Sequence, residues 1–530
     1  MSRELSPAEQ PADDDSEAAQ LQRLRTIVKR GQLFDAERWG PLLDRVEAVA
    51  ASEVELPGSW LPVLDKQRKG NRSAKLALVS ILTACHRWDG HEDVDTLAKT
   101  VPAPFSQAAL AEVAGPLAPH QQLPFIDEPF ISIDGPEPLE IDDALWAAAD
   151  GDDIVVSIAI ASPADFITSG GALQREVAKR AQTFYHPRHT RLMLPQPLID
   201  ASSLTAGQRR PAIVTRVRVA PSGLATLVDV RHGSVQVQAA ICYDDIDALL
   251  AEETAPAATK TLAAVDEALR EAVHALWAAA QRSEARRIER GAWLLYRYAT
   301  EVSCAPFKSP VIVSANQGSP AHRVVGEAMV LCGAATAQFC GQHNLAVPHR
   351  GQARPKQPPL PPGLYTEPAD IRSMLRHMSP ASTGLVATPH STLGLDAYVQ
   401  ASSPLRRYLD LLVHQQIIAH LAAKPPPHTA TDVQRAIAKC QSTGLKYRRS
   451  QRRADQYFTL LHLAQLGIGS HHPAQLVADI SRKGRHVAYI EQLCVEVDLP
   501  GFGGDHGTRV TVELDTIDVF AGAVRGRVVD

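Results

Sequence analysis

The segment FISIDGPEPLEIDDALWA, residues 130–147, places five carboxylates within ten residues, between two apolar runs. These acidic residues are Asp134, Glu137, Glu140, Asp142 and Asp143. Because neighbouring carboxylates raise one another's pKa, a fold keeps them together only where water solvates them or a cation binds them. The flanking apolar runs would anchor the segment to a core, and Pro136 and Pro138 would stiffen it.

The acidic segment suits a magnesium site better than a calcium loop. An EF-hand loop needs carboxylates at alternate positions and a Gly at the sixth, whereas Gly135 directly follows the first Asp. Magnesium takes oxygen ligands and shares its coordination shell with substrate phosphates, and two such ions about 4 Å apart can cleave a phosphodiester. A solvated acidic loop is the alternative that the pattern alone leaves open.

The length of 530 residues predicts about three domains. Hydrophobic content of 45% is ordinary for a globular protein, and no window approaches the roughly 18 apolar residues of a membrane span. Residues 1–19 are acidic, lack the apolar core of a signal peptide and are expected to be disordered. We therefore expect no membrane partner and a cytoplasmic location.

The cysteine pattern supports the same location. Seven cysteines occur singly and never as CxxC, which indicates free thiols in place of a zinc site or a disulfide framework. They are Cys85, Cys242, Cys304, Cys332, Cys340, Cys440 and Cys494.

The chain reads as an α+β protein of several domains. Apolar spacing predicts helices over residues 20–120, either a helix-turn-helix or winged-helix module or a helical extension packed on the next domain. Strands and long helices alternate over residues 121–468. Residues 469–530 predict five short strands with Gly-rich turns, which suit an OB-fold barrel.

A net charge of −5 excludes a general polycation but not a nucleic-acid partner, since the distribution of charge matters more than the total. Basic residues cluster at 179–195, 446–453 and 481–486. Each cluster is either a solvated face or part of a path that guides phosphates.

Several segments, in order, resemble the ribonuclease II (RNB) family of exoribonucleases. The acidic residues at 134, 140, 142 and 143 resemble its catalytic signature. Four further landmarks are TFYHPRHTRLMLP (183–195), RGAW (290–293), RVVGEAMVLCGAATAQF (323–339) with VPHRGQ (347–352), and ASSPLRRYLDLLVHQQI (401–417). The resemblance covers roughly residues 121–468 and implies a central RNB catalytic domain. The barrel resembles the family's RNA-binding OB domain, whereas helices replace the family's N-terminal cold-shock domains.

The resemblance implies processive hydrolysis of RNA from its 3′ end to nucleoside 5′-monophosphates, with one or two Mg²⁺ ions for which Mn²⁺ can substitute. It implies a metal site of Asp134, Glu140, Asp142 and Asp143, in which Asp142 also orients the attacking water or the terminal nucleotide. Asp142, Asp143 and Arg406 would be the catalytic residues. Glu140 departs from the family, which usually has Asp there, so altered activity is expected.

Arg406 also has a rationale from the residues alone. Ser402 or Ser403 can cap a helix that begins at Pro404, and the N-terminus of such a helix attracts an anion. Arg406 in its first turn would stabilise the charge that a phosphate gains in the transition state. The alternative is an i, i+4 ion pair of Arg406 with Asp410.

The resemblance also implies RNA-binding residues. Tyr185 would stack on the terminal base, Glu327 would contact a ribose hydroxyl, and Tyr398 is the aromatic before the Ser-Pro turn. Trp293 or Tyr296 would be a second stacking partner. Further departures, among them Gly326 in place of an acid and Gln400 and Ala401 before the Ser-Pro turn, mark a divergent member.

The expected partner is the 3′ end of single-stranded RNA, and we expect a monomer. Two other functions remain open. A catalytically impaired scaffold would bind RNA without degrading it, and a metal-dependent endonuclease or DNA exonuclease would not depend on a free RNA 3′ end.

Overall fold

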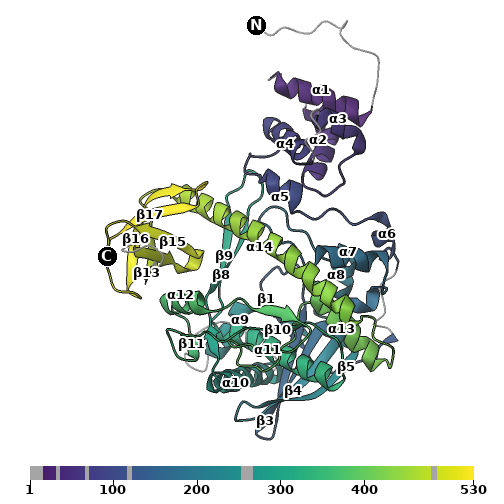
Figure 1. The fold of residues 1–530 in the computed structure, drawn as a ribbon, viewed down its shortest axis with the longest axis vertical. Coiled ribbons are helices and arrows are strands. Elements are labelled where there is room, and N and C mark those ends of the chain that lie inside the picture. The colour runs from purple at the N-terminus through teal and green to yellow at the C-terminus, as the bar shows by residue number, and fades with distance from the viewer. Residues whose placement is uncertain are drawn as a thin grey trace. The chain divides into compact units, whose positions relative to one another are not determined.

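The computed structural model describes residues 16–30, 36–65, 71–115, 122–251, 267–478 and 486–529. The chain divides into two compact units (Figure 1), of which the first is Met1–Pro104 with Cys304–Ser309 and the second is Phe105–Ser303 with Pro310–Asp530. Of residues 1–19, which we expected to be disordered, residues 1–15 lie outside the described residues, whereas residues 17–19 form the start of α1, which Ser16 caps. Most of the basic cluster 481–486 also lies outside the described residues. The domain limits at residues 120 and 468 stay a prediction.

The first unit is helical, as predicted. Its helices are α1 (Glu17–Lys29), α2 (Ala36–Ala50), α3 (Leu61–Leu64), α4 (Asn71–Ala84) and α5 (Val94–Lys99). Their apolar faces bury Leu24, Val46, Trp60 and Leu78 in one core. The described part of this unit contains no β-strand and hence no wing, and the helix-turn-helix module stays a prediction.

The second unit is built on a six-stranded sheet of order β5-β4-β3-β2-β1-β6. Its strands are β1 (Ile131–Asp134), β2 (Asp143–Asp150), β3 (Asp153–Ala161), β4 (Arg209–Val219), β5 (Ala225–Gln236) and β6 (Ala239–Cys242). Neighbouring strands are antiparallel except β1 and β6, which are parallel and place Asp134 beside Cys242.

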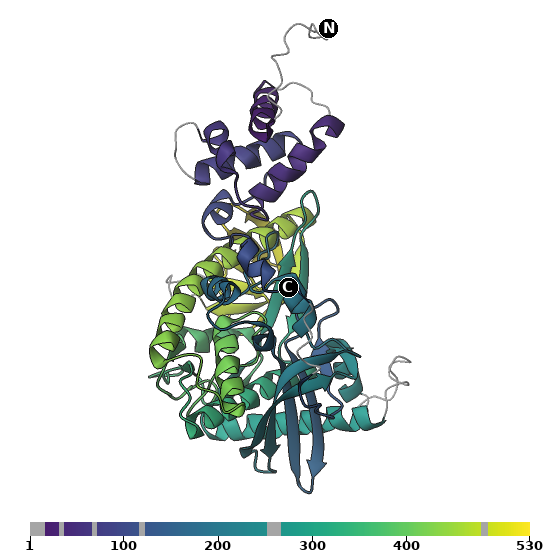
Figure 2. The ribbon, with the colours of Figure 1, turned by 90° about the vertical axis from the view of Figure 1, so that its right-hand side faces the viewer.

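Helices cover both faces of this sheet (Figure 2). They are α6 (Gln107–Ala111), α7 (Ala172–Arg180), α8 (Gln196–Ser202), α9 (Tyr243–Ala251), α10 (Glu267–Glu289), α11 (Pro320–Gln342), α13 (Tyr408–Leu421) and α14 (Ala430–Leu466). Helix α12 (Pro368–His377) instead buries Ala369 against Val477 and Val487. Side chains alternate along a strand, so Leu145 and Ile158 pack on the core with α9, α10 and α11, while Ala144 and Ala159 pack on the core with α7, α8, α13 and α14.

Among the described residues, only α11 is long and apolar enough to cross a membrane by length and composition. Of its apolar window, 61% is buried inside the protein, and this burial explains its apolar sequence. The seven cysteines are free, as expected.

Short strand pairs connect these helices. They are β7 (Trp293–Leu295) with β11 (Gly363–Tyr365), β8 (Tyr298–Ser303) with β9 (Val311–Asn316), and β10 (His349–Gly351) with β12 (Ser382–Gly384).

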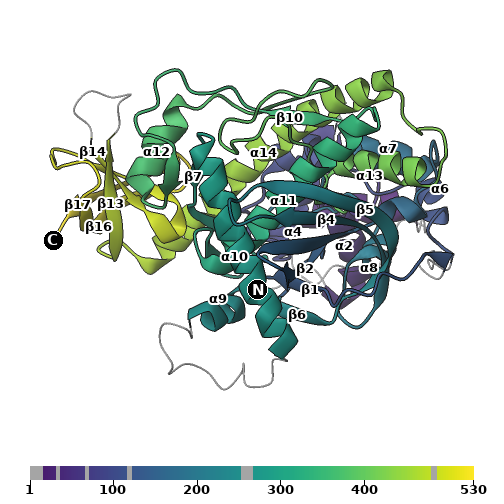
Figure 3. The same ribbon diagram turned by 90° about the horizontal axis from the view of Figure 1, so that it is seen from below.

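The chain ends in a closed five-stranded barrel of order β13-β14-β15-β17-β16, which confirms the OB-like fold (Figure 3). Its strands are β13 (His471–Ala478), β14 (His486–Ile490), β15 (Val495–Leu499), β16 (Arg509–Asp518) and β17 (Ala523–Val528). The long helix α14 connects α13 to the barrel and buries Leu460 and Leu463 in the barrel core. The mixed α+β class with a helical N-terminal region is likewise confirmed.

Candidate active site

The hairpin of β1 and β2 carries the acidic loop, which we define as residues 134–143. Asp134 ends β1 and Asp143 begins β2, and the pairing of Ile131 with Leu145 brings these strand ends together. Burial raises the pKa of Asp134 to about 6. Burial, followed by the negative charges of Asp134 and Asp142, raises the pKa of Asp143 to about 8. Among the described residues neither carboxylate accepts a hydrogen bond, and the charge of Arg406 offsets the repulsion only in part.

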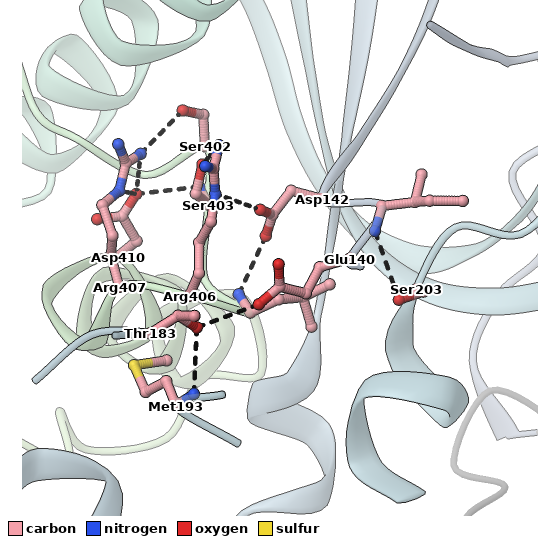
Figure 4. A network of polar contacts seen from close by, with 12 residues as sticks. Glu140, Asp142, Thr183, Met193, Ser203, Ser402, Ser403, Arg406, Arg407 and Asp410 are labelled. Atoms are coloured by element: carbon pink, nitrogen blue, oxygen red, sulfur yellow. Dashed lines mark hydrogen bonds and ion pairs between the residues drawn. The ribbon is translucent and has the colours of Figure 1, made fainter. Parts of the chain in front are cut away.

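Glu140, by contrast, is held by two hydroxyl donors. Thr183 Oγ1 donates to Glu140 Oε1 at 3.1 Å (Figure 4). The Tyr185 hydroxyl donates to Glu140 Oε2, also at 3.1 Å. Burial raises the Glu140 pKa, and these hydrogen bonds oppose that shift. Both donors follow α7 in the chain.

Asp142 connects the acidic loop to a second segment, which we call the arginine turn and define as residues 401–407. Its carboxylate accepts the Leu405 N–H and the Arg406 Nε–H, each at 3.0 Å. The side chain of Asp142 is only 5% exposed, and burial raises its pKa to about 6 against the charge of Arg406. Asp142 therefore orients Arg406 (Figure 4).

The arginine turn is not the start of a helix, which corrects our prediction. Helix α13 begins at Tyr408, and Arg407 before it has extended backbone with φ −133° and ψ 120°. Ser402 and Ser403 accept hydrogen bonds from the side chains of Arg407 and Arg406 at 3.2 Å, so they are not helix caps.

The expected alternative for Arg406, an ion pair with Asp410, is also wrong. Asp410 pairs with Arg407 at 2.6 Å and accepts the Ser403 N–H at 3.0 Å. One turn later on α13, His414 Nε2 lies 2.8 Å from the Ala401 carbonyl, and burial lowers the His414 pKa to about 4, so a neutral ring donates there. Asp410 and His414 are both 1% exposed, and their hydrogen bonds attach the arginine turn to α13.

The two tyrosines nearest the carboxylates were not equally visible in the sequence. Tyr185 was predicted, and its phenol pKa is raised by burial and by Glu140. Tyr243 was missed: burial and the charges of Asp134 and Asp143 raise its pKa, and its ring stacks on His322 with centroids 3.9 Å apart. It follows β6, and only the parallel pairing of β6 with β1 brings it to the acidic loop.

Three predicted RNA-binding residues belong to a separate buried network. Glu327 is 1% exposed and forms an ion pair with Arg287. The Tyr296 hydroxyl donates to Glu284 at 2.7 Å, and Trp293 is 1% exposed with its indole N–H donating to the Leu360 carbonyl at 3.0 Å. The structure thus places Glu327, Trp293 and Tyr296 in packing and pairing roles, and their contacts with RNA stay a prediction.

The residues of the acidic loop fit a magnesium ion only in part on their own. Among the described residues no three Asp, Glu, His or Cys side chains are gathered closely enough to hold a metal. Magnesium commonly takes one or two carboxylates and completes its shell with water and substrate phosphate. The uncompensated carboxylates of Asp134 and Asp143 match that requirement, whereas Glu140 and Asp142 already have protein donors.

An α+β domain with this acidic site, followed by an OB-like barrel, is the architecture of proteins of the ribonuclease II and ribonuclease R type. The RNB domain model matches residues 123–360 and 365–423, which is more than half of the chain. The chain belongs to the RNB domain family.

Curated relatives match over the same part of the chain. An uncharacterized ribonuclease of Synechocystis is 28% identical over 338 residues, which cover 62% of this chain and 48% of the relative. The chloroplastic/mitochondrial ribonuclease II of Arabidopsis thaliana is 30% identical over 339 residues, which cover 60% of this chain and 40% of the relative. The chain spans about half the length of the curated relatives it matches.

Solved structures share the fold. A Candida glabrata Dss1 exoribonuclease active-site mutant gives a TM-score of 0.70 at 18% identity, over 98% of this chain and 70% of that one. Mycoplasma genitalium RNase R in complex with ribose-methylated single-stranded RNA gives a TM-score of 0.68 at 17% identity, over 86% of this chain and 78% of that one. Yeast Ssd1, described as a pseudonuclease, gives a TM-score of 0.53 at 14% identity, over 78% of this chain and 53% of that one.

Proposed function

We propose that this chain is a processive 3′-to-5′ exoribonuclease that hydrolyses RNA to nucleoside 5′-monophosphates. The observation that carries the proposal is the juxtaposition of two uncompensated carboxylates, Asp134 and Asp143, with the Asp142–Arg406 pair. A cation and a phosphate group would together satisfy both sides of this arrangement.

Asp134 and Asp143 would hold Mg²⁺, with Glu140 and Asp142 beside them. The ion supplies Lewis acidity at the phosphate and lowers the pKa of bound water. A divalent cation here would also remove the repulsion that raises the Asp143 pKa. Mn²⁺ would substitute, since it prefers the same oxygen ligands.

Arg406 would stabilise the charge that develops on the scissile phosphate. Its guanidinium is 44% exposed, so it is accessible to a ligand, and its pKa is raised by Asp142, Tyr185 and Glu140 against the effect of burial. It therefore stays protonated throughout the reaction. Asp142 positions it, so no reorganisation is needed in the transition state.

The substrate we propose is single-stranded RNA with a free 3′ end. Tyr185 would stack on the terminal base, an interaction worth roughly 1–3 kcal/mol that tolerates every base. The printed title of the RNase R complex names single-stranded RNA as the ligand of that protein. We further propose that the chain acts as a monomer in the cytoplasm, a compartment that keeps free thiols reduced.

A second candidate function is an RNB scaffold that binds RNA without degrading it. Glu140 in place of the usual Asp favours this alternative, as does the likeness to a structure described as a pseudonuclease. The three aspartates Asp134, Asp142 and Asp143 favour the enzyme.

The test is to incubate the chain with 5′-labelled single-stranded RNA and a matched DNA, with Mg²⁺ or with EDTA, beside an Asp143→Asn variant. Stepwise, metal-dependent shortening of RNA alone, absent in the variant, supports the exoribonuclease. Internal cuts or equal shortening of DNA would favour the other nuclease classes. Tight RNA binding with no shortening, also with Mn²⁺, would overturn the enzyme and leave the scaffold.

A further inference from the structure

A second cluster of arginines lies next to the arginine turn and has too few carboxylates to balance it. Arg350 belongs to β10, where its backbone N–H donates to the Tyr398 carbonyl at 2.8 Å. Its guanidinium reaches Gln400 Oε1 at 3.5 Å, and among the described residues it pairs with no carboxylate. The backbone hydrogen bond therefore fixes the position of the Arg350 Cα, while the positive charge of its guanidinium can still pair with an anion.

Arg448, on α14, extends toward the same place. Its side chain folds back over Gly444, where an added Cβ would lie 3.1 Å from Arg448 Nη1 and 3.2 Å from Gln182 Oε1. Gln182 in turn forms a β-bridge with Arg407. The head of Arg448 is thus placed above Gln182, beside the arginine turn, and it too has no carboxylate partner among the described residues.

The charges of these arginines act on one another. Burial lowers the pKa of Arg350, and the positive charges of Arg407 and Arg448 lower it further, while Tyr398 and Asp410 oppose the shift. Arg407 is neutralised by Asp410. Three guanidiniums with one carboxylate leave two positive charges, of which Arg350 is partly buried and Arg448 is exposed, so an anion would find two uncompensated cations here.

Tyr398 adds a neutral donor to the same cluster. Its ring packs so closely on α11 that a Cβ on Gly333 would overlap it, and this contact fixes the ring. The charges of Arg407 and Arg350 act on its hydroxyl, which has no hydrogen-bond partner among the described residues. Tyr398 was predicted to bind RNA, and the cluster gives it a neighbourhood suited to a phosphate.

We propose that Arg350, Arg448 and Tyr398 form a second anion site that holds a phosphodiester group upstream of the scissile one. The proposal rests on the proposed function, because Arg406 would face the scissile phosphate and Arg407, the next residue, borders the second site. Guanidinium forks match phosphate oxygens in two-point hydrogen bonds, and a phenol donates a third. The ligand class is a single-stranded RNA with at least two linkages before its 3′ end.

The first test is binding in EDTA, which does not depend on hydrolysis. We would measure the affinity of Arg350→Gln, Arg448→Gln and Arg350→Lys for a decanucleotide RNA over a series of salt concentrations. Each Gln variant is expected to flatten the slope of log K against log salt by about 0.7, the value for one phosphate contact on a single strand. Arg350→Lys should restore the slope. The matched control is Arg435→Gln, an exposed α14 arginine paired with Asp432.

The second test is cleavage of a dinucleotide, which has a single linkage, against the decanucleotide. Both Gln variants should lower kcat/KM for the decanucleotide about tenfold more than for the dinucleotide, whereas Arg406→Gln should affect the two substrates alike. Unchanged salt slopes in both Gln variants, or equal losses on the two substrates, would overturn the second site. Failure of the parent chain to cleave either substrate would instead contradict the proposed function, and the binding test would still decide the site.

Discussion

The acidic loop and the arginine turn carry opposite charges and are stabilised in opposite ways. Every charge of the turn has a partner within the protein: Arg406 has Asp142, and Arg407 has Asp410. In the acidic loop, Asp134 and Asp143 have no hydrogen-bond donor among the described residues, and burial raises their pKa values. The charges of the turn are therefore paired within the protein, whereas those of Asp134 and Asp143 would be compensated only by the cation that we propose.

The largest expected effect separates the two regions by activity. Asp143→Asn keeps the shape of the side chain but removes its charge, and with it one of the two uncompensated carboxylates. A bound divalent ion contributes several kcal/mol, so hydrolysis of RNA should fall by about 10³-fold or more. Single-turnover kinetics with labelled RNA would measure it, with Asp152→Asn in the exposed β2–β3 turn as control. A rate within tenfold of the parent chain would contradict the role of Asp143.

The same residue predicts how the stability of the metal-free protein depends on pH. The folded pKa of Asp143 is about 8, above the ordinary value of 3.8, so the folded state binds this proton more tightly than the unfolded state. The stability therefore falls as the pH rises from about 4 to 8, by up to several kcal/mol. In EDTA, the melting temperature should fall less between pH 5 and pH 8 for Asp143→Asn than for the parent chain. Added Mg²⁺ should reduce this fall in the parent chain.

Loss of the carboxylate that pairs with the arginine turn should lower the free energy of unfolding, which is opposite to the effect expected for Asp143→Asn in EDTA. Asp410→Ala leaves Arg407 and the Ser403 N–H without their shared acceptor in the protein interior. Breaking a buried pair in this way costs about 3–5 kcal/mol. Denaturant unfolding would measure the loss against Asp152→Ala, which removes an exposed carboxylate in the β2–β3 turn. A variant as stable as the parent chain would show that the turn does not need this pair.

Asp142 belongs to the acidic loop by sequence and to the arginine turn by contacts, so it sharpens the comparison. Asp142→Asn turns an amide group toward either Leu405 N–H or Arg406 Nε–H, both of which are donors. We expect a loss of about 1.5–3 kcal/mol, the range for hydrogen bonds to charged groups. In EDTA, denaturant unfolding should show that Asp142→Asn lowers the free energy of unfolding, whereas Asp143→Asn raises it. Equal signs would remove the distinction between the two regions.

The smallest expected effect concerns Glu140. Tyr185→Phe removes one of its two hydroxyl donors, which should cost about 0.5–1.5 kcal/mol and raise the Glu140 pKa further. The base-stacking ring is kept, so RNA affinity in EDTA should change far less than in Tyr185→Ala. Calorimetry and a binding titration on the two variants would separate these roles, and equal RNA affinities for Phe and Ala would exclude stacking.

Local sequence patterns predicted the elements that carry the site. Strands were predicted within residues 121–468, where β1 and β3 are found, and the five predicted terminal strands formed the expected barrel. The start of α13 was predicted four residues too early, because Ser-Pro is a common helix start and the carboxylate of Asp142, which accepts from Leu405 and Arg406, comes from elsewhere in the chain.

Candidate residues were predicted where the chemistry lies within one segment and missed where it depends on pairing between segments. The acidic loop, Tyr185 and Arg406 were recognised from their own neighbours in sequence. Tyr243 reaches the loop only through the parallel β1–β6 pairing, and Arg350 reaches the arginine turn only through β10 and Tyr398. Glu327 has a family landmark around it, yet α10 supplies Arg287 as its partner.

The sequence by itself determined which charges exist and which backbone segments carry them, since periodicity and turn residues act over a few residues. The tertiary structure alone decided which charges neutralise one another. Asp142 and Asp143 are chemically identical neighbours, but successive residues at a strand end point to opposite sides. Asp142 therefore meets Arg406, from more than 260 residues away, whereas Asp143 accepts no hydrogen bond among the described residues.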